Sequence, residues 1–393
     1  MKKTALFVLL LLFISMVGGA VVSVNGEEQT RKVTDMLGRE VEIPENVDEV
    51  VGLEAGALRL LVYMEATDMI VGVEDFEKRD GNRPYIMAHP ELQEKRSIGP
   101  QHGGDPELIA EQQPDVIFWT YTTAGDADDL QEKTGIPVIA LNYGDLDDHR
   151  DTFFSALDLI GEVLKKESRA IELKDFFTDT TDDLNQRTQD IPDEEKPSCY
   201  VGGIGHRGVH GIKSTEPDYS PFEFVNADNV ADELDQDHAM VDPEKVIEWD
   251  PDILFIDKGG YELVKEDLSN NSEYSSIDAI QNGRVHGVLP YNYYTTNYGT
   301  VLANSYYIGK ILYQDRFEDI KIEEKTDEIY RKLLGEGVYP EMNETFGGYE
   351  NLQDDINTRN NSNALVFSHG FAIGLPLVVF IVSTIYFWKR KKR

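Results

Sequence analysis

The chain has 393 residues and a formal net charge of −36. Seven basic residues lie at its two ends, in residues 1–3 and 389–393. The rest carries 30 Lys and Arg against 73 Asp and Glu, a net charge of −43. Such an acidic body argues against nucleic acid and anionic lipid surfaces as partners. The only cysteine, Cys199, lies in a strand-like run and is expected to be a packed core residue.

Both ends of the chain have the composition of membrane-targeting segments. Residues 1–26 combine two lysines, an apolar run and small residues, which predicts a secretory signal peptide. A retained N-terminal membrane helix is the alternative, although its apolar run is short. Residues 364–388 are nearly all apolar, and the basic residues 389–393 follow at once. This pattern predicts a single transmembrane helix with a cytoplasmic tail, so the rest of the protein is expected on the extracellular side of the cell membrane.

The first predicted lobe, residues 31–146, begins with a hairpin over residues 34–44. Buried-type strands are then expected at residues 49–53, 70–73, 116–118 and 137–141. Helix signals separate these strands, which predicts a parallel sheet with right-handed crossovers. The connection over residues 74–104 is long and rich in Gly, Pro and charge, which favours a functional surface.

The next part of the chain, residues 147–191, has helical spacing of its apolar residues and no internal proline before Pro192. It predicts one long linking helix, with or without a break. A second α/β lobe is expected over residues 196–340. Residues 341–363 are polar and are predicted to be a flexible stalk leading to the membrane helix.

One stretch of the sequence occurs twice. Residues 105–118 and 242–255 share the order Asp-Pro-Glu, an apolar pair, Pro-Asp and three apolar residues. Asp is a good N-cap, Pro suits the first helical turn, and Pro-Asp ends the helix before a buried strand. Each copy therefore predicts a helix that leads into a parallel strand. The repetition indicates two similar α/β lobes.

Two such lobes are expected to bind a ligand in the cleft at the carboxyl ends of their strands. The residues predicted to bind it are Glu54, Arg83, Tyr121 and Tyr143 in the first lobe, and Arg207, Tyr291, Tyr293 and Tyr294 in the second. Residues 291–294 carry three tyrosines whose rigid rings suit a large, flat or aromatic ligand. A tyrosine-rich surface loop without a ligand is the alternative.

Signals for catalysis are weak. His206 and His210 have ligand-like spacing, but the glycines around them argue against a shared helix face, and no nearby Cys or carboxylate completes a metal site. The sequence contains no Gly-x-Ser-x-Gly elbow and no His-Glu-x-x-His helix. We therefore expect neither an enzyme nor a bound cofactor.

Several of these features together resemble the class III substrate-binding proteins of ATP-driven importers. They are the motif at residues 35–39 with Ile43-Pro44, the repeated Pro-Asp-strand segment, the linking helix and the late strand at Arg284-Val285. The resemblance covers residues 31–334. It implies two Rossmann-like lobes joined by a long α-helix and a ligand that is a ferric siderophore, haem or a cobamide.

The resemblance also implies a partner, the permease dimer of an ABC transporter with its ATPase. In this family one acidic residue on each lobe meets arginines of the permease, and Glu107 and Glu244 match these positions. The predicted tail anchor, in place of a lipid, suits an archaeal cell surface. Two other classes stay open, a cell-surface structural protein and a sensor.

Overall fold

The computed structural model describes residues 29–356. The predicted signal peptide, the transmembrane helix at 364–388, the basic tail and residues 357–363 of the stalk lie outside this range. Within the described range, no helix is long and apolar enough to cross a membrane. The described chain divides into two compact units. The first comprises residues up to Asp179 together with Tyr330–Glu336, and the second comprises Thr180–Ile329 with the residues from Gly337 onward.

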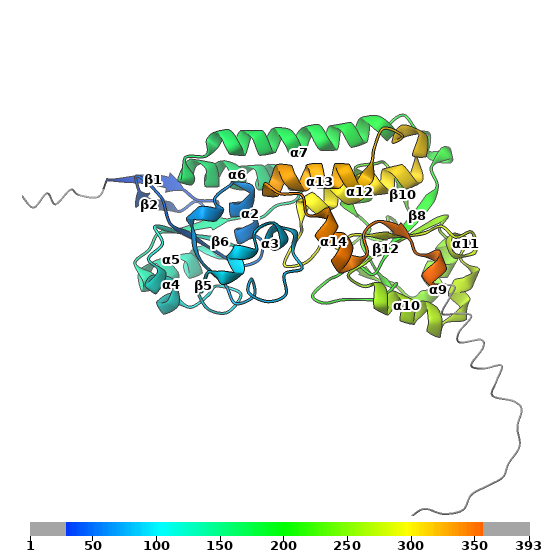
Figure 1. The fold of residues 1–393 in the computed structure, drawn as a ribbon, viewed down its shortest axis with the longest axis horizontal. Helices are drawn as coiled ribbons and strands as arrows, with labels where there is room; N and C mark the ends of the chain where they lie inside the picture. The colour runs from blue at the N-terminus through cyan, green and yellow to red at the C-terminus, as the bar shows by residue number, and fades with distance from the viewer. Residues whose placement is uncertain (1–28, 357–393) are drawn as a thin grey trace, which may run out of the picture. The chain divides into compact units, whose positions relative to one another are not determined.

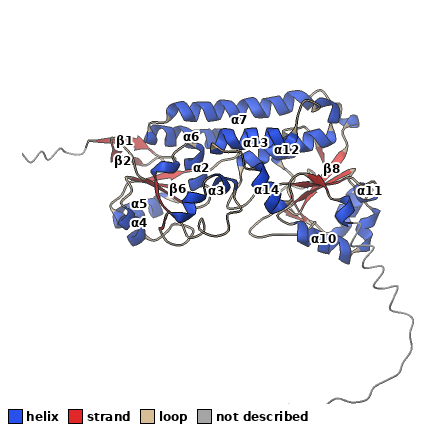
Figure 2. Cartoon of the chain, viewed as in Figure 1, coloured by secondary structure: helices blue, strands red, loops and turns tan. Residues whose placement is uncertain are grey.

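The first unit contains a parallel five-stranded sheet flanked by helices (Figures 1 and 2). Its order is β5 (Arg96–Ser97), β4 (Ile70–Val73), β3 (Val50–Leu53), β6 (Val116–Thr120) and β7 (Val138–Leu141). Its helices are α2 (Ala57–Tyr63), α3 (Pro84–Ala88), α4 (Pro106–Gln112), α5 (Ala124–Thr134) and α6 (Arg150–Leu164). The central strand β3 is fully buried, as expected for a strand covered on both faces.

The second unit also contains a five-stranded sheet, with one antiparallel edge strand. Its order is β10 (Asp228–Asn229), β8 (Ser198–Gly202), β12 (Ile253–Asp257), β13 (Val285–Val288) and β14 (Glu350–Asn351). A separate antiparallel pair joins β9 (Ser214–Thr215) to β11 (Ala239–Met240). The helices are α8 (Ser220–Glu223), α9 (Pro243–Trp249), α10 (Tyr261–Asn270), α11 (Asp278–Gln281), α12 (Tyr298–Leu312) and α14 (Tyr339–Phe346), with α13 (Ile322–Leu334) ending in the first unit.

The predicted stalk is wrong for residues 341–356. These residues form the end of α14, then β14 beside β13, and a helical segment over residues 353–356, the last of the described range. Met342, Leu352 and Ile356 are buried, and the last two belong to the apolar core of the second unit. The segment is polar on average, but its few apolar side chains lie where this core needs them, so it folds as part of the unit.

The repeated stretch is confirmed as a helix leading into a parallel strand. Its two copies are α4 with β6 and α9 with β12. The aspartate that follows proline accepts backbone N–H groups of a neighbouring segment in both copies. The Asp115 carboxylate accepts backbone N–H groups of Asp48 and Glu49 at 2.7 and 2.9 Å, and the Asp252 carboxylate accepts that of Ser198 at 2.9 Å. Each aspartate thus fixes the start of the neighbouring strand.

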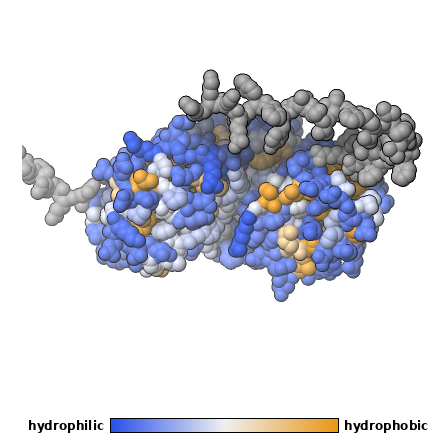
Figure 3. Space-filling model, turned by 90° about the horizontal axis from the view of Figure 1, so that it is seen from below, coloured by the Kyte–Doolittle hydropathy of each residue, from blue (hydrophilic) through white to orange (hydrophobic). Residues whose placement is uncertain are grey.

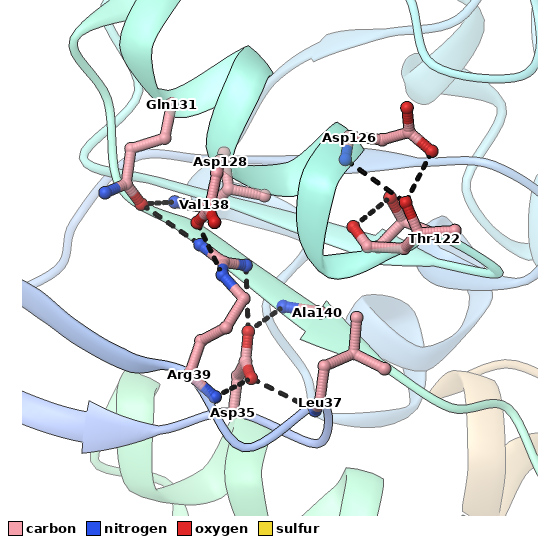
Figure 4. A network of polar contacts seen from close by, with 10 residues as sticks. Asp35, Leu37, Arg39, Thr122, Asp126, Asp128, Gln131, Val138 and Ala140 are labelled. Atoms are coloured by element: carbon pink, nitrogen blue, oxygen red, sulfur yellow. Dashed lines mark hydrogen bonds and ion pairs between the residues drawn. The ribbon is translucent and has the colours of Figure 1, made fainter.

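The motif at residues 35–39 joins the predicted hairpin to the sheet of the first unit. The hairpin is formed by β1 (Thr30–Thr34) and β2 (Glu40–Pro44). At its turn the Asp35 carboxylate accepts N–H groups of Leu37 and Arg39 and, at 3.2 Å, that of Ala140 in β7 (Figure 4). Arg39 donates to Asp35 and to Asp128 of α5, both at 2.9 Å (Figure 4). The buried Asp35 therefore holds the turn, a strand and an arginine at once.

The linking region has the break that the prediction allowed, and it consists of two helices, α6 and α7 (Glu167–Thr188). The break lies at Lys165, which has a left-handed conformation with φ of 56°, and the next residue, Lys166, returns a backbone hydrogen bond to Gly161. In the first unit, Phe177 of α7 packs edge-on against Phe153 of α6, with 5.0 Å between ring centroids.

Candidate functional site

The carboxyl ends of parallel strands lie at one edge of a sheet, and the loops that follow them carry the ligand-binding groups of such folds. We call these loops the carboxyl edge of each unit. In the first unit it is formed by the residues that follow β3, β4, β6 and β7. In the second unit it is formed by the residues that follow β8, β12 and β13, and by Glu216, which follows the separate strand β9 and accepts a hydrogen bond from Tyr291 of the loop after β13.

The carboxyl edge of the first unit contains three of the four residues predicted there. Tyr121 follows β6 with φ of 53° and is 57% exposed, and its ring lies 6.2 Å from that of Tyr143, which follows β7. Glu54 follows β3 with φ of 72°, and its carboxylate pairs with the Nδ1 of His102. Positive φ in three non-glycine residues, Glu54, His102 and Tyr121, marks loops held in strained conformations, which concentrate at functional sites.

A buried carboxylate organises these loops. Glu74 follows β4 and is 1% exposed. Its two oxygens accept the backbone N–H groups of Glu54 at 3.1 Å and of Gly103 at 3.0 Å. Two loops far apart in sequence are therefore held by one side chain. The sequence gives little sign of this role, because Glu74 is one of many acidic residues.

Arg59 of α2 is a second residue that the sequence reasoning missed. It is 1% exposed, donates a hydrogen bond to the Tyr143 hydroxyl at 2.5 Å, and lies over the Tyr85 ring with 5.0 Å to its centroid. Burial, the largest influence on the Tyr143 hydroxyl, raises its pKa. Arg59 therefore fixes the ring on which Tyr121 rests. A lone arginine within the apolar run from Leu58 to Val62 is the signal that would have indicated it.

Arg83 lies inside the first unit. Its side chain is fully buried, and its Nε lies 3.2 Å from the Glu77 carboxylate, which also accepts the Tyr85 hydroxyl at 2.8 Å. Burial raises the pKa of Glu77, and the charge of Arg83 opposes that rise. The guanidinium thus compensates an internal carboxylate. A direct contact of Arg83 with a ligand would require this ion pair to open, and ligand binding by Arg83 stays a prediction.

In the second unit the glycine-rich loop after β8 and the tyrosine loop after β13 lie together. The Asn292 amide donates to the carbonyl of Gly205 at 3.0 Å, and the buried Asn297 amide donates to that of Tyr291 at 3.0 Å. Arg207 is exposed at the tip of its loop with φ of 53°. Tyr293 and Tyr294 are partly buried. The predicted residues of this unit therefore come from two loops that contact one another.

The tyrosine loop also closes over two carboxyl groups that the sequence reasoning did not select. The Tyr291 hydroxyl donates to Glu216, which follows β9. Asp257 ends β12, is 2% exposed, and accepts the Gly259 N–H at 2.8 Å. Burial raises the pKa of both carboxyl groups to about 7, and repulsion from Glu216 adds to the rise at Asp257. An aspartate ending an otherwise apolar strand was the available signal for Asp257.

Three histidines gather near the same loop. The ring of His206 stacks on that of His238 with 4.2 Å between centroids, and the ring of His210 lies 6.3 Å from His238. Burial and the two neighbouring imidazoles lower the pKa of His238. Across residues 29–356, no group of three His, Cys, Asp or Glu side chains is arranged to hold a metal ion. Cys199 is buried, and burial raises the pKa of its thiol.

Glu107 and Glu244 occupy equivalent positions, each in the first turn of its repeated helix, and both are exposed. Leu108, next to Glu107, is an exposed large apolar side chain (37%). The face drawn in Figure 3 is mostly hydrophilic, with small separate hydrophobic patches. Both glutamates are free to meet a partner, and docking on a permease stays a prediction for them.

Comparison with known proteins places the chain in a family. Residues 50–289 match the family described as "Periplasmic binding protein". The molybdate-binding protein MolA of Haemophilus influenzae is 24% identical over 337 residues, which cover 79% of this chain and 93% of MolA. The structure of molybdate-bound MolA matches with a TM-score of 0.63 at 23% identity, covering 78% of this chain and 98% of that one.

Two further solved structures share the fold. A periplasmic solute-binding protein of Veillonella parvula matches with a TM-score of 0.65 at 18% identity, covering 81% of this chain and 97% of that one. CeuE of Helicobacter pylori with bound Ni(II) matches with a TM-score of 0.56 at 18% identity, covering 78% and 96%. At these identities the likeness concerns the fold.

Both units have polar and aromatic side chains at the carboxyl edge of a parallel sheet, where folds of this kind bind ligands. The chain belongs to the periplasmic binding protein family, and its resemblance to the class III substrate-binding proteins is confirmed. It is therefore a solute-binding protein of an ABC transporter. Proteins of this family bind solutes for transport.

Proposed function

We propose that this protein binds a metal chelate, in the first place a ferric siderophore, and delivers it to an ABC permease from the extracellular face of the membrane. The observation that carries this proposal is the aromatic lining of both carboxyl edges. In the first unit the exposed Tyr121 forms it, with its ring beside that of the buried Tyr143, and in the second unit the partly buried Tyr293 and Tyr294 form it. Rigid aromatic rings with a polar tip suit a ligand of the size and mixed polarity of an organic chelate.

A small oxyanion is the ligand named for MolA, and CeuE was crystallised with Ni(II). In the present chain the buried arginine Arg83 is engaged by Glu77, and the second edge presents carboxyl groups that repel an anion. This arrangement supports a chelate over a free oxyanion. Haem and corrinoids have the same mixed polarity, and they are the alternatives within this proposal.

The remaining parts of the proposal concern the partners. Residues 364–388, outside the described range, would tether the protein to the membrane, and deletion of residues 364–393 should release it into the soluble fraction. Glu107 and Glu244 would dock the two units on the permease. Replacing both by lysine should leave solute affinity unchanged and abolish stimulation of the transporter ATPase. Unchanged stimulation would remove the docking role.

The experiment that tests the ligand class is a titration of the purified full-length chain, followed by tryptophan and tyrosine fluorescence. Ferric trihydroxamates, haem, cobalamin and molybdate are compared at high and low salt. We expect saturable quenching by the ferric chelate and an affinity at least tenfold lower in Tyr121→Ala and Tyr293→Ala. Ile171→Ala, which removes an exposed apolar side chain on α7, is the control and should bind normally. Saturation by molybdate alone would overturn the proposal.

A further inference from the structure

The second unit buries two carboxyl groups that have no cationic partner. Glu216 is partly buried and Asp257 is 2% exposed, both at the carboxyl edge. Within residues 29–356, the charged groups that act on them are other acids. Asp237, on the loop before β11, acts on Glu216, and Glu216 itself acts on Asp257. Buried charges in proteins are normally paired or bound to a metal. This pair lacks such compensation from the described chain.

Hydrogen bonds compensate the pair only in part. Glu216 accepts the Tyr291 hydroxyl, and Asp257 accepts the backbone N–H groups of Gly259, at 2.8 Å, and of Tyr291. A carboxylate has about four acceptor positions, so both groups can accept further donors. Of the two residues, Glu216 is the one that keeps part of its surface exposed.

A buried hydroxyl points to the same place. Tyr219 is fully buried, and its ring lies edge-on against that of Tyr291 with 5.6 Å between centroids. The charges of both Asp257 and Glu216 raise the pKa of its hydroxyl, after the larger effect of burial, and Tyr291, on which its ring packs, donates its own hydroxyl to Glu216. The hydroxyl lies near the Asn304 amide but makes no hydrogen bond of normal geometry to any residue in the described chain. A buried hydroxyl left without a partner is rare and calls for an explanation.

We infer that Glu216 and Asp257, with the hydroxyls of Tyr219 and Tyr291, form a subsite that receives a compact positive charge of the bound solute. The inference rests on the proposed function, which it extends by giving the solute a cationic group. An incoming cation would supply the missing counter-charge and give the Tyr219 oxygen an electrostatic partner. Oxygen donors of this kind suit an ammonium group or a hard metal cation, and they disfavour an anion.

The first test compares two chelates that differ in one charge. A linear ferric trihydroxamate with a free ammonium group is titrated at pH 8 against the same chelate acetylated at that nitrogen. We expect the full-length protein to bind the ammonium form at least tenfold more tightly. The preference should disappear in Glu216→Gln/Asp257→Asn and persist in Glu273→Gln, which removes an exposed acid of the same unit. Equal binding of both chelates by the unaltered protein overturns the inference and leaves the proposed function standing.

The second test needs no chelate. Ca²⁺, whose preferred ligands are oxygen atoms, is added at constant ionic strength, and unfolding of the second unit is followed by the fluorescence of Trp249 in a Trp119→Phe/Trp388→Phe background. We expect Ca²⁺ to raise the unfolding midpoint in the unaltered protein and in Glu273→Gln, and to raise it less in the double variant. This result without chelate binding would support the cation subsite and remove the proposed function. If Ca²⁺ raises the midpoint equally in all three proteins and the two chelates bind equally well, Glu216 and Asp257 do not form a cation subsite. The two carboxyl groups then only share protons in the core.

Discussion

The two units bury charge in different ways. In the first unit the buried carboxylate Glu77 faces Arg83, and Glu74 is used by backbone N–H groups of two loops. In the second unit, Glu216 and Asp257 face tyrosines and one another. The buried carboxylates of the first unit are compensated by groups of the chain itself. Those of the second unit have no cationic partner within residues 29–356, so a positively charged solute can gain electrostatic energy by binding there.

The difference predicts separate roles for the buried charges of the two units, although the folds of the units are similar. A charge already neutralised inside a unit fixes the shape of that unit, and it contributes little selectivity for a ligand's charge. An uncompensated buried pair costs stability in the free protein, and this cost is recovered when a suitable ligand binds. We therefore expect substitutions of the buried charges of the first unit to act mainly on folding. Substitutions of Glu216 and Asp257 should also change binding of a charged solute.

The largest expected effect is that of Glu77→Ala. It leaves Arg83 buried without its main partner and removes the acceptor of the Tyr85 hydroxyl. Asp80, at 3.6 Å and half exposed, compensates the arginine only weakly. Removing one partner of a buried ion pair costs about 3–5 kcal/mol of unfolding free energy. Urea unfolding of the first unit, followed by Trp119 in a Trp249→Phe/Trp388→Phe background, measures the cost.

The control for this prediction is Glu132→Ala, which removes an exposed acid of α5 and should change stability by less than about 0.5 kcal/mol. The double variant Glu77→Leu/Arg83→Met replaces the pair by apolar side chains. It should recover much of the loss, because apolar groups carry no charge to compensate. A loss below about 1 kcal/mol in Glu77→Ala would show that Arg83 does not depend on Glu77, and the contrast between the units would fail.

The second prediction concerns pH. Here the substitution is expected to stabilise the protein, whereas Glu77→Ala destabilises it. Burial raises the pKa of Glu216 and that of Asp257 to about 7, from unfolded values near 4. Between about pH 4 and pH 7 the unfolded chain therefore loses these protons before the folded chain does. The contribution of the pair to stability is fully present below about pH 4 and is lost as the pH rises through about 7. Each unit of pKa elevation corresponds to about 1.4 kcal/mol.

We expect Glu216→Gln/Asp257→Asn to be more stable than the unaltered protein above pH 7, by at least about 3 kcal/mol, the amount that corresponds to the pKa elevation of one of the two carboxyl groups, and equal to it near pH 4. Other acids of this unit also titrate in this range, so the difference between the two proteins is the informative quantity. Trp249 fluorescence in a Trp119→Phe/Trp388→Phe background follows the second unit alone. A double variant that is less stable at pH 8 would mean that the carboxylates are compensated after all.

Much of this fold could be predicted from local signals. The repeated helix and strand were found because capping aspartates, first-turn prolines and apolar runs act over a few residues. The fate of residues 341–356 could not be predicted, because Leu352 and Ile356 are buried by strands and helices far away in sequence. The same holds for Asp35, whose partner Ala140 is 105 residues distant.

The site was predicted less completely than the fold. The strand ends located Glu54, Tyr121, Tyr143 and the tyrosine loop, since the edge of a parallel sheet follows from the strands themselves. Whether a side chain at that edge faces solvent or the interior depends on packing between loops. For this reason the sequence predicts Arg83, which is buried, as a ligand contact. It does not predict Glu74, Arg59, Glu216 or Asp257 as residues of the site. In a chain with 73 acidic residues, composition gives no way to single out a buried one.

The smallest expected effect compares the two copies of the repeat at their N-caps. The Asp105 side chain accepts the N–H groups of Glu107 and Leu108 at 2.9 and 3.1 Å, whereas the Asp242 side chain makes no capping hydrogen bond. Loss of a capping side chain costs about 1 kcal/mol. Asp105→Ala should therefore destabilise the first unit by about 1 kcal/mol, and Asp242→Ala should destabilise the second by less than about 0.5 kcal/mol. Urea unfolding with the unit-specific tryptophans measures both, and Asp105→Asn, which keeps a capping oxygen, is the matched control.

Equal losses in both units would mean that Asp242 stabilises α9 through its charge near the helix start, since the helix dipole acts without a hydrogen bond. In that case the two copies would be equivalent in energy even though only one of them is capped.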